Sequence, residues 1–278
     1  MPELKEPSYF AQELAAEPWP FEVPTTLEDY GSLFAGAGPG QLAGEASVLY
    51  LWSSTAAREI ARLRPDARII IIFREPVSFL RSLHLQWVNS RVEDEHDLRA
   101  ALALEEARRS GRHLPRGGYL PRLLLYSEHM RYVDQLRRYR EYFPESRLMV
   151  LPYDDYRRDN PATVGTILEF LGVDDMVVPP TGDVNESYRV RTTYGQDMVD
   201  AVSMGRSRGA RMLKAVMPQP LRRTMKKAIH DHIVYAKPRE PDQDLLLELR
   251  RRYKPEVVAL SEWMERDLVT LWGYHDIG

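Results

Sequence analysis

Arg74 and Ser82 are the two residues whose types and spacing point most clearly to chemistry. They lie eight positions apart in the string RIIIIFREPVSFLRSLHLQW. A guanidinium donates paired, charge-assisted hydrogen bonds and a hydroxyl adds a further donor, so the two together suit a phosphate monoester dianion. The alternative is structural: Arg74 pairs with a nearby carboxylate, and Ser82 lies on a polar helix face.

The pattern around these residues predicts a strand, a tight turn and a helix. Residues 67–73 (ARIIIIF) are rich in β-branched side chains without polar alternation, which is typical of a strand buried on both faces of a parallel sheet. After the Arg-Glu-Pro turn, apolar residues recur at helical spacing over residues 77–88. We therefore expect Arg74 at the carboxyl end of the strand and Ser82 two turns into the helix, facing one crevice.

Further elements follow in the same alternation. A second strand is predicted at 147–152 (RLMVLP), and helices are predicted at 56–63 with Ser53 or Ser54 as the cap, at 120–142, and at 161–171 between a capping Asn160 and Gly172. Residues 1–40 read as loop, and residues 206–234 and 242–271 as helical. The chain is predicted to be one α/β domain over 1–278. It has a parallel β-sheet flanked by helices in a core over 1–183, and a mainly helical acceptor-side part over 184–278.

Composition excludes several classes of protein. The 278 residues carry 38 basic and 41 acidic side chains, a net charge of −3, and no cysteine. The balance argues against a nucleic-acid binder, and no apolar run approaches the roughly 18 residues that span a membrane. We expect a cytoplasmic protein. The acidic residues between 93 and 106 and the basic ones between 206 and 227 are expected to be solvated helix faces.

Several stretches occur in one order along the chain: KEPSYF (5–10), GEAS (44–47), YLWS (50–53), the Arg74 and Ser82 segment, YVDQLRRYREYFP (132–144), VLPYDDY (150–156), FLGV (170–173) and residues 253–272. Together they resemble the sulfotransferases that use 3′-phosphoadenosine 5′-phosphosulfate (PAPS), in particular the bacterial, heparan-sulfate-sulfotransferase-like branch with its P-loop-like fold. In that family an Arg and a Ser at this offset hold the 3′-phosphate of the nucleotide. The resemblance implies this role for Arg74 and Ser82.

The resemblance implies further site residues. Glu6 corresponds to the general base of the heparan-sulfate branch and Lys5 to an electrostatic aid, against the alternative of an exposed charged pair in an N-terminal loop. Tyr153 would lie against the adenine, or else be a core tyrosine. Arg189 and Arg191 would cover the nucleotide, face the acceptor or be solvated. His84 is expected to be a buried histidine with satisfied hydrogen bonds, although it lies close enough to Ser82 to line the site.

The implied reaction moves a sulfuryl group from PAPS to a hydroxyl or amine and leaves 3′-phosphoadenosine 5′-phosphate, without a metal. The acceptor would be a small molecule, a glycan or a lipid-like compound, and an oligomer is compatible with the sequence. One departure is that the family's Pro-Lys-x-Gly-Thr-Thr loop for the 5′-phosphosulfate occurs nowhere in the chain. We expect that the natural chain starts upstream of Met1.

The alternative to an enzyme is a homologue that binds the nucleotide or the acceptor but is catalytically impaired. A nucleotide kinase relative is disfavoured, because the chain has no G-x-x-x-x-G-K-[ST] motif.

Overall fold

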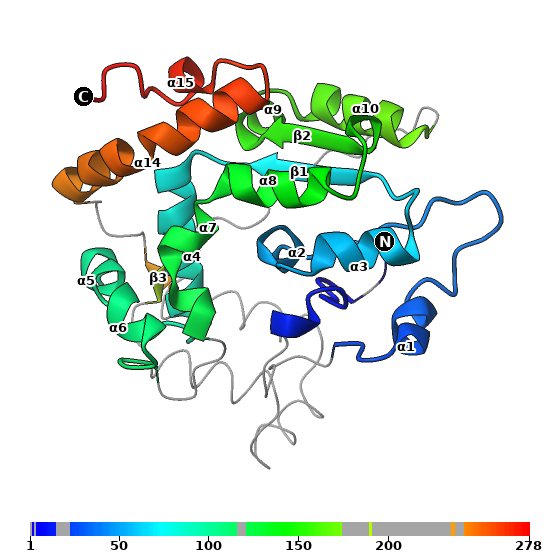
Figure 1. The fold of residues 1–278 in the computed structure, drawn as a ribbon, viewed down its shortest axis with the longest axis horizontal. Helices are drawn as coiled ribbons and strands as arrows, with labels where there is room; N and C mark the ends of the chain where they lie inside the picture. The colour runs from blue at the N-terminus through cyan, green and yellow to red at the C-terminus, as the bar shows by residue number, and fades with distance from the viewer. Residues whose placement is uncertain are drawn as a thin grey trace, which may run out of the picture.

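The computed structural model describes residues 2, 4–14, 23–115, 121–173 and 242–278, together with the backbone of two short strands at 189–190 and 235–236. Its helices and strands (Figure 1) are η1 (Gln12–Leu14), α1 (Leu27–Ser32), α2 (Leu49–Trp52), α3 (Ala56–Leu63), β1 (Ile69–Phe73), α4 (Pro76–Asn89), α5 (Leu98–Ala103), α6 (Glu105–Arg109), η2 (Pro121–Leu124), α7 (Tyr126–His129), α8 (Tyr132–Arg140), η3 (Glu145–Arg147), β2 (Leu148–Pro152), α9 (Tyr153–Arg158), α10 (Asn160–Leu171), β3 (Arg189–Val190), β4 (Tyr235–Ala236), α14 (Gln243–Trp263) and α15 (Leu268–Leu271).

The predicted parallel sheet is present. Strands β1 and β2 pair in parallel, in a register that runs from Ile69 opposite Leu148 to Phe73 opposite Pro152. Strands β3 and β4 form a separate antiparallel pair. Because parallel strands end at the same edge of a sheet, the residues that follow Phe73 and Pro152 start from equivalent positions.

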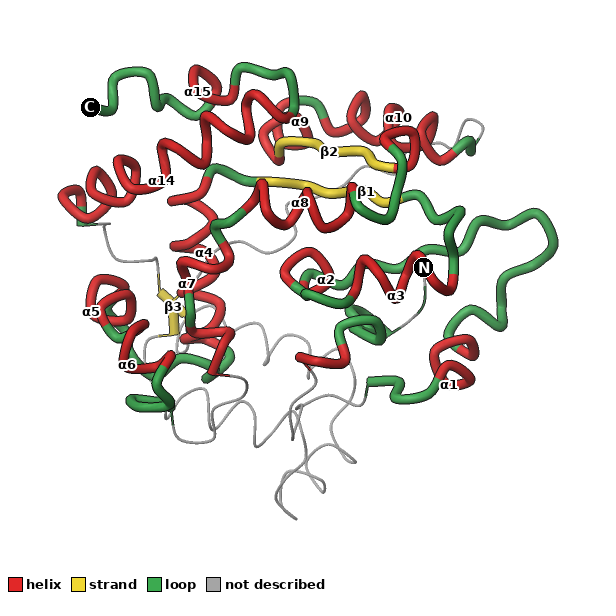
Figure 2. Tube along the Cα trace, viewed as in Figure 1, coloured by secondary structure: helices red, strands yellow, loops and turns green. Residues whose placement is uncertain are grey.

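Helices pack around this sheet (Figure 2). Helix α14 packs on α4 and α8, and α8 also packs on α2 and α3. Their contact faces are fully buried leucines: Leu80 of α4, Leu136 of α8 and Leu260 of α14 are each 0% exposed. Burial of each such side chain contributes about 2 kcal/mol. This core holds α4 and its strand in a fixed relation.

Strand β1 differs from its prediction in one respect. Ile71 and Phe73 are buried, but Ile72 between them is 47% exposed. Since successive side chains of a strand point to opposite faces, one face of β1 packs on the core while the other is partly open. The expectation of burial on both faces was therefore wrong.

The helix expected over 120–142 is broken into η2, α7 and α8. The backbone leaves the helical region at Leu125 and at Arg131, which precede α7 and α8. Each new helix start gains an acceptor from far along the chain: Glu105 accepts from the Ser127 amide at 2.9 Å, and Glu256 accepts from the Val133 amide at 2.7 Å. Tertiary caps therefore override the helical period of this segment.

Other boundaries agree with the predictions more closely. Helix α3 starts as expected at Ala56, but its cap position is held by Thr55 and not by Ser53 or Ser54; Ser53 Oγ still accepts a hydrogen bond from the Ala56 amide at 2.9 Å. For α10 the capping side chain is Asp159, which accepts from the Ala162 amide at 3.0 Å, and not Asn160, which is already helical. Gly172 ends that helix in the left-handed conformation.

Three further expectations differ from the structure or lie outside the described residues. A helix, α1, forms at 27–32 within the segment that was expected to be loop. The long C-terminal helix expected over 242–271 ends at Trp263 and is followed by the separate α15. Residues 206–234, expected to be helical, lie outside the described residues. Of the helices described, none is long and apolar enough to cross a membrane.

Candidate functional site

Arg74 comes directly after β1, at the carboxyl edge of the sheet. Its backbone is fixed by Tyr132, whose hydroxyl donates to the Arg74 carbonyl oxygen at 3.1 Å. The Tyr132 ring is buried and packs on Phe73, with ring centres 4.5 Å apart. Strand β1 and the Tyr132 ring together fix the backbone position from which the Arg74 side chain extends.

The Arg74 guanidinium lies over the ring of Tyr153, with its central carbon 5.7 Å from the ring centre. Tyr153 follows β2 as Arg74 follows β1, so the contact joins equivalent positions of the two strands. No carboxylate among the described residues forms an ion pair with this guanidinium. The arrangement places a cation over an aromatic face.

Ser82 lies in α4, away from the buried stripe of that helix, which comprises Val77, Leu80, His84 and Trp87. Its side chain is half-buried, and its hydroxyl has no hydrogen-bond partner in the described part of the chain. The N-terminus of α4 is already capped, because the Glu75 carboxylate accepts from the amides of Val77 at 3.1 Å and Ser78 at 2.6 Å. The first amides of α4 are therefore already bonded to Glu75.

The C-terminal segment contacts the same edge. The Trp272 indole donates to Asp154 at 2.8 Å, and the Tyr274 hydroxyl donates to Glu75. Sequence reasoning did not single out these contacts. The only signal was the resemblance of residues 253–272 to the closing helices of the family.

Glu6 and Lys5 lie in the N-terminal segment. Glu6 has a left-handed backbone, with φ of 54°. The Glu6 side chain is exposed, but partial desolvation by the surrounding chain, with the nearby charge of Glu45 as a smaller contribution, raises the pKa of its carboxyl. Lys5 is exposed, and no hydrogen bond or ion pair within the described chain joins either residue to Arg74, Ser82 or Tyr153.

Glu45 anchors this segment indirectly. Its carboxylate accepts from Ser47 Oγ at 2.9 Å and from the Tyr30 hydroxyl at 3.3 Å. Ser47 Oγ in turn accepts from the Ser8 amide at 3.0 Å, two residues after Glu6. Burial raises the pKa of Glu45. Two carboxyl groups of raised pKa thus lie close together beside the N-terminal segment.

Comparison with known proteins places this arrangement in a known fold. The family model of the sulfotransferase domain matches residues 56–179. A crystal structure of a sulfotransferase from Alicyclobacillus acidocaldarius matches with a TM-score of 0.65 and 23% sequence identity, and the match covers 98% of this chain and 87% of that chain. The chain has the sulfotransferase fold. No curated protein matches it significantly.

Within this sulfotransferase fold the matched segment, 56–179, contains Arg74, Ser82 and Tyr153 but neither Lys5 nor Glu6. Arg189 starts β3, whose backbone lies beside α4, the helix of Ser82 (Figure 1). The Arg189 side chain and all of Arg191 lie outside the described residues. The structure therefore brings Arg74 and Tyr153 together, and it places the strand of Arg189 near the helix of Ser82.

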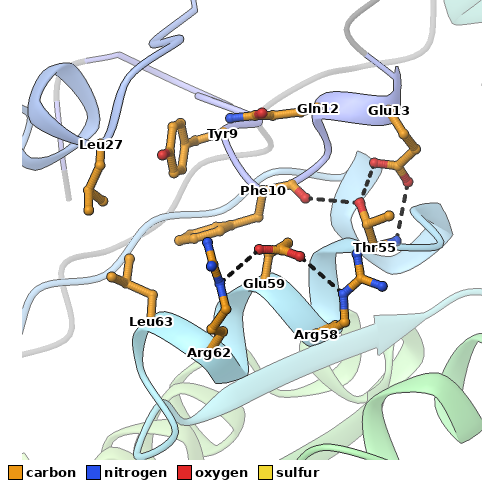
Figure 3. Close-up of a pocket in the computed structure, with 10 residues that line it drawn as sticks. All are labelled: Tyr9, Phe10, Gln12, Glu13, Leu27, Thr55, Arg58, Glu59, Arg62 and Leu63. Atoms are coloured by element: carbon orange, nitrogen blue, oxygen red, sulfur yellow. Dashed lines mark hydrogen bonds and ion pairs between the residues drawn. The ribbon is translucent and has the colours of Figure 1, made fainter.

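A pocket of about 340 Å³ opens between the N-terminal segment and α3 (Figure 3). Its wall includes Tyr9, Phe10 and Leu63, together with the ion pairs that Glu59 makes with Arg58 at 3.0 Å and with Arg62 at 3.2 Å. None of the predicted site residues lines it.

Glu13 lies at one end of this pocket and caps α3. Its carboxylate accepts from the Ser54 amide at 2.8 Å and from the hydroxyls of Ser53 and Thr55, both at 2.5 Å. These bonds lower the pKa of Glu13 although burial opposes them.

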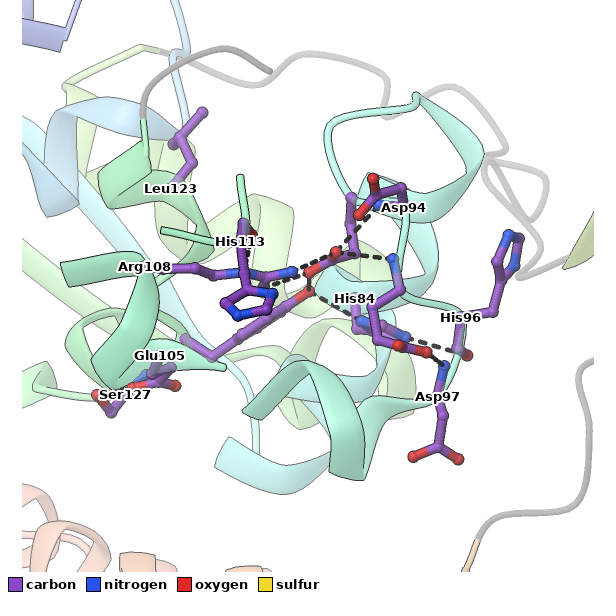
Figure 4. A network of polar contacts seen from close by, with 12 residues as sticks. His84, Asp94, His96, Asp97, Glu105, Arg108, His113, Leu123 and Ser127 are labelled. Atoms are coloured by element: carbon purple, nitrogen blue, oxygen red, sulfur yellow. Dashed lines mark hydrogen bonds and ion pairs between the residues drawn. The ribbon is translucent and has the colours of Figure 1, made fainter. Parts of the chain in front are cut away.

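A buried polar network joins side chains of α4, α6 and α7 (Figure 4). Glu93 and Arg108 pair in its centre, Tyr126 donates to Glu93 at 3.0 Å, and His84 Nδ1 lies 2.8 Å from the Tyr126 hydroxyl. The expectation for His84 as a satisfied buried histidine is confirmed. The expectation of a solvated acidic face over 93–106 was wrong for Glu93 and Glu105, which are 2% and 8% exposed.

No group of three or more histidine, aspartate or glutamate side chains that could hold a metal ion occurs in the described ranges.

Proposed function

We propose that this protein is a sulfotransferase that moves a sulfuryl group from PAPS to a hydroxyl or amine acceptor. The observation that carries the proposal is the position of Arg74. Within a sulfotransferase fold, its guanidinium lies at the carboxyl edge of the parallel sheet, over Tyr153, with no carboxylate partner among the described residues. Crevices outside the carboxyl ends of parallel strands are where α/β folds bind nucleotides.

The nucleotide-binding residues in this proposal are Arg74, Ser82 and Tyr153, joined by Arg189 and Arg191. The free guanidinium and the free Ser82 hydroxyl fit a phosphate monoester, because both are donors without a described acceptor. The Tyr153 ring offers a face for the adenine. When bound, the donor nucleotide supplies the sulfuryl group.

Glu6 is the proposed general base and Lys5 an electrostatic aid. The acceptor must lose a proton as it attacks, and a carboxylate takes that proton more readily when its pKa is raised. Partial desolvation raises the pKa of the exposed Glu6 carboxyl in this way. The left-handed backbone at Glu6 is a second feature common at functional positions.

The acceptor in this proposal is a small molecule, a glycan or a lipid-like compound with a free hydroxyl or amine. A cytoplasmic location and a single domain over 1–278 belong to the same proposal.

A second candidate function is nucleotide binding without transfer. The 278 residues contain no Pro-Lys-x-Gly-Thr-Thr stretch to hold a 5′-phosphosulfate. Arg74 and Ser82 would bind the nucleotide in either case.

Calorimetric titration of the chain with 3′-phosphoadenosine 5′-phosphate, repeated with Arg74→Ala, tests the proposal. We expect binding that weakens at least about tenfold in the variant, since a charge-assisted bidentate contact is lost. Incubation with PAPS and a panel of phenol, sugar and amine acceptors then separates transfer from binding alone. Equal affinity of the two proteins for the nucleotide would refute the proposal.

A further inference from the structure

We infer that residues 272–274 (Trp-Gly-Tyr), here called the 272–274 turn, are a positioning element that sets how the proposed site recognises a 3′-phosphorylated nucleotide. The inference rests on the proposed function. It assigns Tyr274 and Trp272 roles that act through Glu75 and Asp154.

The 272–274 turn reaches both strand ends. Tyr274 donates through its hydroxyl to Glu75, the residue after Arg74. Trp272 donates through its indole N–H to Asp154 at 2.8 Å, the residue after Tyr153. Because Phe73 and Pro152 are register partners, the two contacted carboxylates occupy equivalent positions. One turn therefore ties the end of β1 to the end of β2.

The turn is itself held in place. Gly273 has a φ of 69°, the left-handed conformation that reverses the chain after α15 and that a glycine adopts without strain. The Arg250 guanidinium lies 5.2 Å from the centre of the Tyr274 ring and donates to the Trp272 carbonyl oxygen at 3.2 Å. Tyr274 is 0% exposed. A buried and braced hydroxyl of this kind leaves its partner little freedom to move.

The contact with Glu75 matters because Glu75 links two parts of the proposed site. Its carboxylate caps α4, the helix of Ser82, and its backbone directly follows Arg74 in the chain. Without the Tyr274 hydroxyl, the Glu75 side chain loses its tie to the 272–274 turn. Arg74 and Ser82, which are proposed to hold the 3′-phosphate, are then no longer held in a fixed position relative to each other. The contact with Asp154 acts on the other partner, Tyr153, which is proposed to hold the base.

The role of Tyr274 therefore predicts a loss of selectivity. Tyr274→Phe should raise the Kd for 3′-phosphoadenosine 5′-phosphate about tenfold. It should change the Kd for adenosine 5′-phosphate, which has no 3′-phosphate, less than about twofold. Tyr253→Phe is the matched control, since the Tyr253 hydroxyl is buried without a hydrogen-bond partner in the described chain, and it should leave both affinities unchanged.

A double-mutant cycle separates positioning from general stability. In the Arg74→Ala background, Tyr274→Phe should weaken binding by less than about twofold, because the group that it positions is gone. Equal weakening of both nucleotides by Tyr274→Phe, or an undiminished effect in the Arg74→Ala background, overturns the inference. Circular dichroism of each variant reports whether it folds.

Trp272→Phe provides a second and independent test if Tyr274→Phe does not fold. It removes the donor to Asp154 but keeps an aromatic ring, and it should weaken both nucleotides by about fivefold through Tyr153. Unchanged affinities in this variant contradict the inference. An unaltered chain with no preference for the 3′-phosphorylated nucleotide would instead show that the proposed function fails, and the inference with it.

Discussion

Glu93 and Arg108 form a two-pronged ion pair, with nitrogen–oxygen distances of 2.6 and 2.7 Å, in which neither side chain is exposed. Burial raises the pKa of Glu93, but the Arg108 contact outweighs it and holds the pKa below its ordinary value. The pair joins the segment after α4 to α6, so it stabilises the side of the molecule that supports the helix of Ser82.

Removal of one partner of this pair should be costly. Arg108→Met leaves the Glu93 carboxylate buried without its cation, and we expect the free energy of unfolding to fall by about 3–5 kcal/mol. The neighbouring Arg109→Met is the matched control. Its pair with Glu128 lies at the surface, with Arg109 48% exposed, and should contribute less than about 1 kcal/mol. Urea denaturation of both variants measures the difference, and equal losses would contradict this account.

The ring of Tyr153 should matter more than its hydroxyl. Tyr153→Phe keeps the surface beneath the Arg74 guanidinium and should leave the Kd for 3′-phosphoadenosine 5′-phosphate within about twofold. Tyr153→Leu removes the aromatic face and should raise that Kd about tenfold. Calorimetry gives both values. A larger effect from Phe than from Leu would show that the hydroxyl, not the ring, is used.

Glu6 should affect turnover and not nucleotide affinity. Under the proposed function, Glu6→Gln should lower kcat by about 100-fold or more, because an amide cannot take the acceptor proton. The Kd for the nucleotide should stay unchanged. Activity of the unaltered enzyme should rise with pH through the raised pKa of Glu6. A full kcat in Glu6→Gln would assign the base elsewhere.

Glu13 should stabilise the fold without affecting the nucleotide. Glu13→Ala removes the carboxylate that caps α3, and a loss of about 1–2 kcal/mol is expected. Glu59→Ala, in the same helix, removes contacts to two exposed arginines and should cost less than about 1 kcal/mol. Thermal unfolding compares the two, and nucleotide titration should show no change in either.

The buried side chain of His129 should make the folded state less stable at acid pH. Burial lowers its pKa to about 4. As the pH falls from 6.5 to 4, the unfolded chain binds a proton at this residue before the folded one does, so the folded state loses about 3 kcal/mol relative to it. His129→Gln should remove that part of the pH dependence. Urea denaturation at pH 7 and pH 4 measures it, and an unchanged slope in the variant would exclude His129 as its source.

The sequence best predicted the elements that depend only on the local pattern of residues. The β-branched run before Arg74 and the helical spacing after it are sufficient to place Arg74 at a strand end and Ser82 two turns along α4. The Arg74–Tyr153 contact follows only once the parallel register of β1 and β2 is known. Tyr153 was predicted as a site residue from the resemblance to sulfotransferases and not from residue spacing.

What the sequence did not predict depends on contacts between distant segments. Glu13, Glu105 and Glu256 each cap a helix that lies far from them in the chain. The charge pattern of the sequence does not distinguish such residues from glutamates that face solvent. The break in the helix predicted over 120–142 has the same origin. Nothing in the local sequence of Glu93 distinguishes a buried ion pair from an exposed one.

The 272–274 turn also has a consequence for the order of assembly. Tyr274 lies 199 residues after Glu75, and Trp272 lies 118 residues after Asp154. During synthesis the strands and α4 leave the ribosome long before the turn does, and contacts of such long sequence separation form late. Nascent chains that already contain β1, β2 and α4 therefore still lack the ties at the sheet edge, and the ability to bind nucleotide should appear only once residues 272–274 have been synthesised.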